Sequence, residues 1–567
     1  MTKLPCWNWL RLYNRQTLGS DLVAAMIVTI MLIPQSLAYA LLAGLPPEMG
    51  LYASILPLIA YAIFGTSRTL SVGPVAVVSL MTATAVGNVA QQGTVDYATA
   101  AITLALLSGL ILLFLGFIRF GFVTNFLSHP VVSGFITASG VLIALSQLSH
   151  ILGVAASGKT LPELAFSLAT VIGATNPYTL SVGLCCLLIL HWSRGHLAKR
   201  LERLGLTPLL AGALAKCVPV AVIVMSTLIA YALELDARGV ELVGAIPQGM
   251  PAFSQPHIEW TVIRELILPA LLVALIGFVE SVSVGRTLGA KRRERIDANQ
   301  ELIGLGAANI ASAFSGGFPV TGGFSRSVVN FDAGAKTQGA SALTAVGIAL
   351  TALFLTPALY YLPKVTLAAT IVIAVSTLID WKIIKTAWDY DQADFMAIVI
   401  TIVLTLTLGV EIGVMSGVGA SISLHLYRTM RPHFAIVGTV PGTEHYRNID
   451  RHKVLTHHNI LSIRIDESLY FANAAFLEEI VDTELSQRDG IEHVILMCPA
   501  VNMIDLSAVE ALQEVNSRLL ERGVKLHLSE VKGPVMDALK RSALLLQLSG
   551  NVYLSHHAAV LELTQKS

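Results

Sequence analysis

The sequence of 567 residues is 54% hydrophobic and only 13% charged, and its 37 basic and 37 acidic residues give a formal net charge of zero. Soluble globular domains carry about 25% charged residues, so this deficit, spread over long uncharged stretches, predicts a polytopic α-helical membrane protein. The balanced charge gives no sign of a nucleic-acid partner. The five cysteines form no CxxC pair, and we interpret them as packing residues rather than as metal ligands or disulfide partners.

The first nineteen residues are polar and aromatic and do not resemble a signal peptide. Trp7 and Trp9 stand close to Arg11 and Arg15, a mixture that favours the membrane–water interface. We therefore expect residues 1–19 to form a cytoplasmic or interfacial segment before the first membrane span.

Apolar stretches alternate with short polar breaks over residues 20–431, which we assign to a transmembrane transport domain. Fourteen segments are candidate spans, although some are shorter than the roughly 20 residues that a full crossing needs. They lie near residues 20–42, 49–66, 73–91, 98–118, 129–153, 176–192, 208–233, 262–288, 298–314, 324–338, 340–361, 364–379, 393–408 and 410–428.

Two basic loops give the expected orientation. Residues 196–205 and 289–300 are short and rich in Lys and Arg, so the positive-inside rule predicts that both are cytoplasmic. Two of the candidate spans separate them, which agrees with their lying on one side. Counting onward along the chain predicts that the N-terminus and the C-terminus are both cytoplasmic.

The composition changes after residue 431. Short β-rich segments such as "ILSIRID", "HVILMCP" and "VKLHLSEV" alternate with helical patterns such as "SAVEALQEVNSRLLERG". Strands that alternate with helices predict a small α/β domain over residues 432–567, and about 130 residues are enough to form one core.

Two breaks in the apolar pattern occupy corresponding positions. "SRTLSVGPVAVVSLM" (67–81) introduces the third candidate span and "SGGFPVTGGFSRSVVNFDAG" (315–334) the tenth, each the third of its half of seven. Paired interrupted segments of this kind indicate a transporter binding site. A helix that begins inside the membrane directs its free N–H groups and positive dipole end at the midplane, so two such ends would form an anion site.

Particular residues in these breaks suit such a site. Pro74 is typical of the first turn of a helix, and Gly73 and Gly322 would let the backbone approach a ligand closely. Arg326 is the only formal charge between Glu301 and Asp332, and with the hydroxyl of Ser325 it would add a fixed positive charge. The alternative is that the breaks are kinks or surface loops and that Arg326 extends to the interface.

Glu280 is a second ionisable residue within an apolar segment. Apolar residues precede it from Leu266 to Val279, and no charge follows before Arg286. A carboxylate in this setting needs a partner, a proton or a bound cation. Either it carries H⁺ or binds Na⁺ as the coupling ion, or it forms a structural pair with Arg326 or a polar neighbour.

The first span contains a third group of candidates. Pro34 would kink this helix and free backbone carbonyls, and Gln35, Ser36 and Tyr39 follow within about one turn. These residues either form a wall of the pocket or pack the kink.

Three stretches resemble one family. Residues 34–81, "PQSLAYALLAGLPPEMGLYASILPLIAYAIFGTSRTLSVGPVAVVSLM", resemble the hallmark segment of the SulP sulfate-permease anion transporters. The segment "GGFPVTGGFSRSVVNFDAGAKTQGA" resembles their tenth-helix region, and the last 130 residues resemble a STAS domain, the cytoplasmic module of these transporters.

The resemblance implies a fold and a mechanism. It implies fourteen segments in two inverted repeats of seven, arranged as a core domain and a gate domain, with the anion bound between the third and tenth helices. The core would move against the gate like an elevator, and the protein would be a homodimer without a cofactor. The substrate site implied by motif comprises Gln35, Tyr39, Gly73, Pro74, Val75, Ser325 and Arg326. Glu280 stands where proton-coupled sulfate transporters of the family carry an acidic residue.

The STAS resemblance has one departure. Sigma-regulator STAS domains carry a phosphorylated serine or threonine directly after Asp-Ser, whereas Leu506 follows Asp505 here. Ser507 remains as a site of modification, or it caps the helix together with Asp505. A cytoplasmic regulator at this domain is a possible partner.

We therefore expect H⁺-coupled sulfate uptake across the inner or plasma membrane. The alternatives are Na⁺-coupled bicarbonate uptake and H⁺-coupled dicarboxylate uptake by the same fold, and next an anion channel or exchanger or a membrane-anchored signalling protein. No catalytic constellation is present in the sequence, so we do not expect an enzyme.

Overall fold

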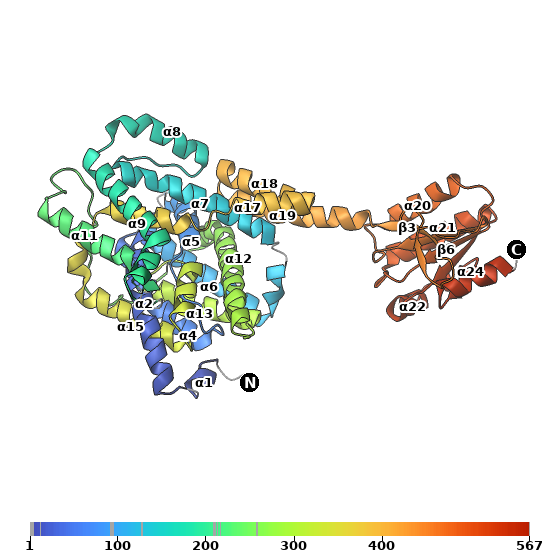
Figure 1. Cartoon of the computed structure of the whole chain (residues 1–567), viewed down its shortest axis with the longest axis horizontal. Coiled ribbons are helices and arrows are strands. Elements are labelled where there is room, and N and C mark those ends of the chain that lie inside the picture. Colours follow the sequence, from blue (N-terminus) through green and yellow to red (C-terminus); the bar gives the residue numbers. More distant parts are fainter. Residues whose placement is uncertain are drawn as a thin grey trace. The chain divides into compact units, whose positions relative to one another are not determined.

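Helices form the first part of the chain and a mixed sheet with helices forms the last part (Figure 1). The computed structural model describes residues 5–11, 13–90, 96–125, 129–207, 211–212, 214–215, 217–256 and 259–565. The chain divides into two units, Met1–Ser421 and Ile422–Ser567, and each is described by itself.

The first unit is built from helices and two very short strands. Its α-helices are α1 (Pro5–Leu10), α2 (Arg15–Leu42), α3 (Pro47–Tyr52), α4 (Leu56–Phe64), α5 (Ala76–Ala90), α6 (Tyr97–Phe117), α7 (His129–Leu152), α8 (Leu161–Val171), α9 (Pro177–Arg203), α11 (Val218–Ala232), α12 (Trp260–Lys291), α13 (Ala298–Phe314), α14 (Phe324–Asp332), α15 (Gly339–Phe354), α16 (Lys364–Val375), α17 (Lys382–Tyr390), α18 (Gln392–Leu408) and α19 (Val410–Met430), the last of which continues into the second unit. The strands are β1 (Val72–Gly73) and β2 (Thr321–Gly322), and three 3₁₀ turns cover Phe120–Asn125, Ile172–Ala174 and Thr356–Leu359.

Each of the fourteen predicted segments contains a helix, but the helices differ in length. Six segments of the described chain are long and apolar enough to cross a membrane, namely Arg15–Leu42, Pro47–Phe64, Tyr97–Phe117, Pro130–Leu152, Pro177–Arg203 and Trp260–Lys291. The shorter helices leave the number of spans a prediction. Part of the predicted segment 208–233 lies outside the described residues, since 208–210, 213 and 216 are not described.

Some boundaries differ from the prediction for local reasons. The tenth segment, predicted over 324–338, is helical only to Asp332, because Gly334 adopts a left-handed conformation (φ +88°) that ends the helix. Helices α8 and α17 were not predicted. The side chain of Thr160 caps the start of α8 by accepting a hydrogen bond from the Glu163 amide.

The helices of the first unit pack in two groups. In one group, α13 packs against α4 and α6, α12 against α6, and α15 against α2 and α4. In the other, α7 packs against α16 and α18, and α9 against α11 and α16. Contacts of α5 with α7, and of α2 with α16, join the groups. The first group carries both β1 and β2, since α12 packs on β2 and α4 on β1.

A buried carboxylate ties the loop before β1 to the first turn of α13. Glu301 is 1% exposed, and its two oxygens accept hydrogen bonds from the Tyr61 hydroxyl (2.8 Å), the Thr66 amide (2.7 Å) and hydroxyl (2.5 Å), and the Ser67 amide (3.1 Å). These four donors offset the cost of burying the carboxylate. Asp21 on α2 does the same for the loop after α14, since it accepts from the amides of Lys336 and Thr337.

The second unit contains a six-stranded mixed sheet. Its elements are β3 (Phe434–Thr439), β4 (Tyr446–Asn448), β5 (Ile460–Ile465), α20 (Ala474–Ser486), β6 (His493–Met497), α21 (Leu506–Glu521), β7 (Lys525–Ser529), α22 (Gly533–Leu539), α23 (Leu544–Gln547), β8 (Val552–Tyr553) and α24 (His556–Gln565). The strand order is β4-β3-β5-β6-β7-β8. Strands β5 to β8 run parallel, and β3 is antiparallel to both β4 and β5.

Apolar residues cover both faces of this sheet. Leu477 of α20 and Leu512 of α21 pack on one face with the buried residues of β5, β6 and β7. On the other face Val560 of α24 packs with Val437 and Ile495. Because both faces are covered, the parallel strands read as nearly continuous apolar runs, which is why the sequence identified them.

Two buried histidines of this unit are held in their neutral form. Burial, and next the neighbouring His493, lower the pKa of His527 to about 4, and burial followed by His557 lowers that of His556 to about 4. Neutral His527 accepts a hydrogen bond on Nδ1 from the Asn551 amide (3.0 Å). Neutral His556 bonds Ser529 through Nδ1 (2.8 Å) and Ser462 through Nε2 (3.0 Å).

Replacing the buried carboxylate should destabilise the first unit. Glu301→Gln places an amide NH₂ where donors already point, so at least one donor loses its acceptor at a cost of roughly 1–3 kcal/mol. We expect a lower melting temperature of the purified full-length protein. Glu294→Gln is the matched control, because Glu294 pairs with Arg68 at 3.3 Å on a partly exposed surface, where an ion pair contributes little. Equal melting temperatures for the two variants would contradict the prediction.

The two histidines should make the second unit less stable in acid. Their pKa values of about 4 lie below the unfolded value of about 6.5, so the unfolded chain binds more protons between these two pH values. The free energy of unfolding should therefore fall as the pH falls from about 6.5 to about 4, by up to about 1.4 kcal/mol per pH unit for each histidine. Hydrogen exchange of β5 to β7, corrected for the intrinsic rate, measures this. His527→Gln should reduce the slope and exposed His445→Gln should leave it unchanged; the reverse result would refute the assignment.

Candidate functional site

The two glycine-containing breaks meet in the structure. Strands β1 and β2 pair antiparallel, with Val72 opposite Gly322 and Gly73 opposite Thr321. Helix α5 begins at Ala76, with two residues between it and the end of β1, and helix α14 begins at Phe324, with one residue between it and the end of β2. The strand pair thus brings together the starts of two helices that are about 250 residues apart in the sequence.

Side-chain hydroxyl groups fix this pair in place. The Ser327 hydroxyl accepts from the Ser71 amide (3.0 Å) and donates to the Gly323 carbonyl (2.7 Å). On the other side, the Ser281 hydroxyl of α12 accepts from the Gly322 amide (2.9 Å) and lies 2.7 Å from the Thr321 hydroxyl. All six residues are buried, and the bond between Ser71 and Ser327 joins the two halves of the chain.

Arg326 lies inside this junction rather than at a surface. Its side chain comes from the first turn of α14, only 2% of the residue is exposed, and Nη1 donates to the Pro74 carbonyl at 2.6 Å. Its Nε and Nη2 are buried and have no hydrogen-bond partner among the described residues. Burying a guanidinium with two unused donors costs folding free energy. A bound anion would accept hydrogen bonds from both donors and neutralise the charge. The reading of Arg326 as a residue that reaches the interface is therefore wrong.

The glycines accommodate the guanidinium. A Cβ on Gly323 would lie 2.9 Å from Arg326 Nη2, and a Cβ on Gly73 would lie 3.3 Å from the same atom. The prediction that Pro74 lies in the first turn of a helix is wrong, since it stands two residues before Ala76, the first residue of α5. Its carbonyl, which accepts from Arg326, gives it a role that the pattern did not indicate.

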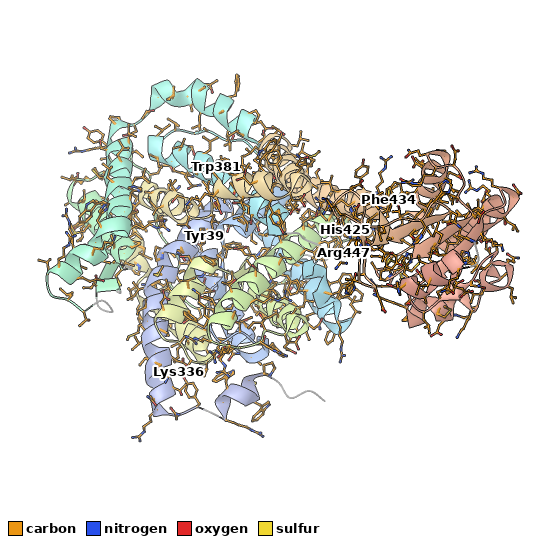
Figure 2. The ribbon with its side chains drawn as sticks, turned by 45° about the vertical axis from the view of Figure 1, so that its right-hand side comes forward. Tyr39, Lys336, Trp381, His425, Phe434 and Arg447 are labelled. Carbon is orange, nitrogen blue, oxygen red and sulfur yellow. The ribbon has the colours of Figure 1, made fainter. Side chains whose placement is uncertain are left out.

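Tyr39 and Gln35 are carried by α2, which contacts both α5 and α14. Tyr39 lies in the interior of the helical unit (Figure 2) and is 7% exposed. Arg326 and Glu280 both lie within electrostatic range of its hydroxyl. One turn earlier, Gln35 Oε1 is buried without a partner among the described residues. Ser36, by contrast, shares a hydrogen bond of 2.7 Å with Ser54 and serves packing between helices.

Within the described residues, Glu280 does not form the structural pair with Arg326 that was one of its two expected roles, and it lines a small apolar cavity instead. Its Oε2 is buried without a hydrogen-bond partner in the described chain, and no ion pair within 4.0 Å links it to Arg326 there. It lines a small apolar cavity, large enough for about one water molecule, whose other walls are Val131, Val132, Phe135 and Ile136 of α7, Ile276 and Val279 of α12, and Val414 of α19. Glu280 thus stands where α12 meets helices outside its own packing group.

Ser325 is the candidate that the structure keeps apart. It is exposed, and no hydrogen bond of its side chain is present in the described residues. The residues that sequence reasoning missed are Ser71, Ser281, Thr321 and Ser327, which hold the two strands. Their only signal was a cluster of hydroxyl side chains around the glycines.

At the second unit, Asp505 caps helix α21. Its Oδ1 accepts from the Ala508 amide (2.9 Å), and its Oδ2 accepts from the Phe471 amide (2.8 Å). Ser507 is exposed, is the second residue of the helix and does not cap it.

The geometry at this junction favours binding of an anion. In the described ranges no group of three or more His, Cys, Asp or Glu could hold a metal ion. The junction instead offers a positive side chain, two helix starts with free amide groups and small hydroxyl residues, which together form a typical anion site.

Comparison with known proteins agrees with this arrangement. Residues 18–401 match the model of the sulfate permease family, and residues 452–559 match the STAS domain. The chain is 38% identical over 561 residues to sulfate transporter 4.1, chloroplastic, of Arabidopsis thaliana, covering 96% of this chain and 80% of that protein. It is 31% identical to high affinity sulfate transporter 2 of Stylosanthes hamata, covering 96% of this chain and 84% of that protein.

Solved structures show the same fold. The structure of murine solute carrier 26 family member A9, an anion transporter in the inward-facing state, has a TM-score of 0.88 at 25% identity and covers all of this chain and 94% of that one. The transmembrane domain of the cyanobacterial bicarbonate transporter BicA has a TM-score of 0.60 at 20% identity, covering 72% of this chain and 98% of that one. The predicted class, a polytopic helical membrane protein with a small α/β STAS domain, is confirmed, and the chain belongs to the sulfate permease family of anion transporters.

Proposed function

We propose that this transporter imports sulfate together with H⁺ and binds the anion where α5 and α14 begin. The observation that carries the site is Arg326, buried at that junction with two unused N–H donors. Relatives named as sulfate transporters support sulfate as the substrate.

The charge of the site suits a dianion. Arg326 supplies one positive charge, and the start of an α-helix contributes up to about half a charge, so two starts and the guanidinium together approach the charge of sulfate. Because Gly73 and Gly323 have no side chain, the space beside the guanidinium stays open to a small anion. Gln35 and Tyr39 would close the pocket from α2 and donate to sulfate oxygens.

Protonation of Glu280 would couple the proton gradient to transport. The carboxylate faces apolar side chains of α7 and α19, where the ionised form is strongly disfavoured. The neutral form can pass along this apolar surface, whereas the ionised form cannot. Protonation therefore favours movement of the helix group that holds the anion against the group that contains α7, which is an elevator-type step.

Membership of the family also supports an oligomeric state, a membrane location and an orientation for this chain. We infer a homodimer in the inner or plasma membrane with both termini in the cytoplasm, and a regulator that acts through the STAS domain. Na⁺-coupled bicarbonate or H⁺-coupled dicarboxylate uptake is the alternative, because an Arg and two helix starts do not separate small anions by themselves. Uptake of labelled sulfate, bicarbonate and fumarate into proteoliposomes, under separate H⁺ and Na⁺ gradients, distinguishes them.

Arg326→Ala should weaken sulfate binding by at least about tenfold, because hydrogen bonds to charged groups contribute roughly 1.5–3 kcal/mol. Arg326→Lys should recover part of the affinity, since it keeps the charge but not the planar set of donors. Equilibrium binding of labelled sulfate to purified protein measures both. The control is Arg68→Ala, which removes a partly exposed basic residue paired with Glu294 and should bind as wild type does. Wild-type affinity in Arg326→Ala would return Arg326 to a structural role.

Glu280→Gln should abolish sulfate accumulation driven by a pH gradient while sulfate–sulfate exchange continues, because the amide is neutral at every pH and transfers no proton. Counterflow and gradient-driven uptake in the same proteoliposomes separate the two activities. Glu48→Gln, at the first turn of α3, is the matched control. Undiminished accumulation in Glu280→Gln would rule out this residue as the proton carrier, and loss of exchange as well would indicate damage to the anion site.

A further inference from the structure

The sheet of the second unit has a gap between β3 and β5. The two strands pair only over Phe434–Ile436, where Ile436 stands opposite Ile463. Beyond this point β3 continues beside β4, and Thr439 exchanges two backbone hydrogen bonds with Leu455. The residues of β5 that would have continued the pairing, Ile460–Ser462, pair with β6 on one side, and on the other side no strand of the described chain pairs with them.

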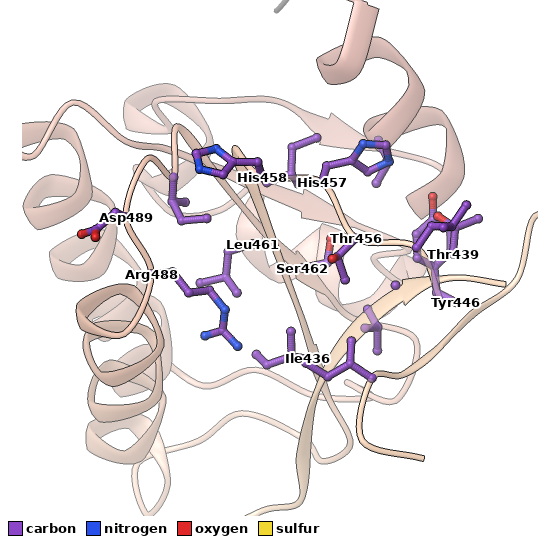
Figure 3. Close-up of a pocket in the computed structure, with 17 residues that line it drawn as sticks. Ile436, Thr439, Tyr446, Thr456, His457, His458, Leu461, Ser462, Arg488 and Asp489 are labelled. Carbon is purple, nitrogen blue, oxygen red and sulfur yellow. The ribbon is translucent and has the colours of Figure 1, made fainter. Parts of the chain in front are cut away.

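The gap is a cavity of about 410 Å³ that reaches both faces of the sheet (Figure 3). Leu461 and Ile491 line it on the side of α20, and Val560 lines it on the side of α24. The complete lining is Ile436, Val437, Gly438, Thr439, Tyr446, Ile449, Leu455, Thr456, His457, His458, Ile460, Leu461, Ser462, Arg488, Asp489, Ile491 and Val560. A water molecule occupies about 30 Å³ of liquid water, so if each non-hydrogen atom takes a similar volume, the cavity holds a ligand of roughly a dozen non-hydrogen atoms.

Both ends of the gap are closed along the strand direction. The Ile436–Ile463 pair closes one end, and the Thr439–Leu455 bridge closes the other. An added β-strand would have to pass through one of these pairs, so an extended peptide does not fit. Eight of the seventeen lining residues are aliphatic, and contact with them disfavours a strongly hydrated inorganic anion such as sulfate. A compact molecule with an apolar body fits the space.

One charged side chain points into this apolar space. The guanidinium of Arg488 lies between Leu461 and Ile436, whereas the carboxylate of Asp489 points away from the other lining side chains (Figure 3). Nη1 of Arg488 is bonded to Glu484, while Nε and Nη2 make no hydrogen bond in the described part of the chain. Two donors in fixed geometry are what a carboxylate accepts from an arginine. His457 and His458 lie at the same cavity and offer further ring N–H groups.

The inner wall connects to a buried hydrogen-bond chain. Ser462 lines the cavity, and its hydroxyl bonds His556 Nε2 at 3.0 Å, while His556 Nδ1 bonds Ser529 at 2.8 Å. A ligand group that reached Ser462 would act on this chain across β5, β6 and β7. The cavity is therefore connected to the centre of the domain rather than being a surface depression.

We propose that the gap between β3 and β5 binds a small aromatic or aliphatic monocarboxylate, with its apolar body between the two strands and its carboxylate on Arg488. The site lies entirely within the second unit, so it does not depend on which anion is transported. It gives the STAS domain a metabolite ligand of its own.

The probe is 2-naphthoate, which is water-soluble and has about the dozen non-hydrogen atoms that the cavity holds. Hydrogen–deuterium exchange on the full-length protein locates it. We expect slower exchange of amides in 437–439 and 455–463 as the naphthoate concentration rises, with saturation. The uncharged analogue 2-naphthalenemethanol should protect the same amides at concentrations at least about tenfold higher, since an arginine–carboxylate pair contributes roughly 1.5–3 kcal/mol.

Two variants test the two halves of the proposal. Thr456→Trp, at an exposed lining position, should fill the cavity and abolish protection by both compounds. Arg488→Gln should weaken naphthoate at least tenfold and leave the alcohol unchanged. Lys453→Gln, an exposed basic residue that does not line the cavity, is the control and should behave as wild type.

Each half of the proposal can be overturned by a separate result. Absence of protection at millimolar naphthoate, or protection that Thr456→Trp does not remove, overturns the site. Equal affinity of naphthoate and its alcohol, or no effect of Arg488→Gln, overturns the carboxylate. If Arg488→Gln alters hydrogen exchange of β6 and β7 without ligand, this variant has disturbed the fold. The test then rests on Arg488→Lys, which keeps a positive donor, and on Thr456→Trp.

Discussion

The structure of the transport unit depends on a guanidinium held at the point where two helices begin. Arg326 cannot be buried at low cost by itself, since one carbonyl of Pro74 satisfies only part of its donors. Two features of the surrounding chain also act on this side chain. Gly73 and Gly323 leave room for the side chain, and the positive ends of α5 and α14 would repel it were no anion to join them. Positive charge is therefore concentrated at the one point where we propose that the anion binds.

The scaffold around this point is built from backbone pairing and neutral hydroxyl groups. Strands β1 and β2 fix the distance between the helix starts, and Ser281 and Ser327 fix the strands. The two buried carboxylates nearby, Glu301 and Asp21, are fully engaged with backbone amides and hydroxyl groups. They hold the loops that enter and leave the site and leave the positive charge of Arg326 uncompensated. Glu280 differs from both because its Oε2 has no donor among the described residues and faces apolar side chains.

The sequence predicted much of this because charge is rare in it. Arg326 and Glu280 were identified as isolated charges in apolar segments, and the STAS strands as apolar runs between helical patterns. The pairing of β1 with β2 could not be predicted, since two-residue strands leave no periodic pattern and their partners are 250 residues apart. The hydroxyl residues that hold them are common in membrane helices and give no signal alone. The gap between β3 and β5 was also invisible, because it arises where a strand changes neighbours and not from any residue type.

The two-residue pairing of β1 with β2 also bears on how such a protein can change its substrate. Val72, Gly73, Thr321 and Gly322 are joined through main-chain groups, and these groups persist whichever side chains flank them. Residues of α2, such as Gln35 and Tyr39, take no part in this pairing, so they can be exchanged without separating the two helix starts. Selectivity for size and shape can therefore diverge within one frame, while preference for negative charge is inherited with the backbone itself.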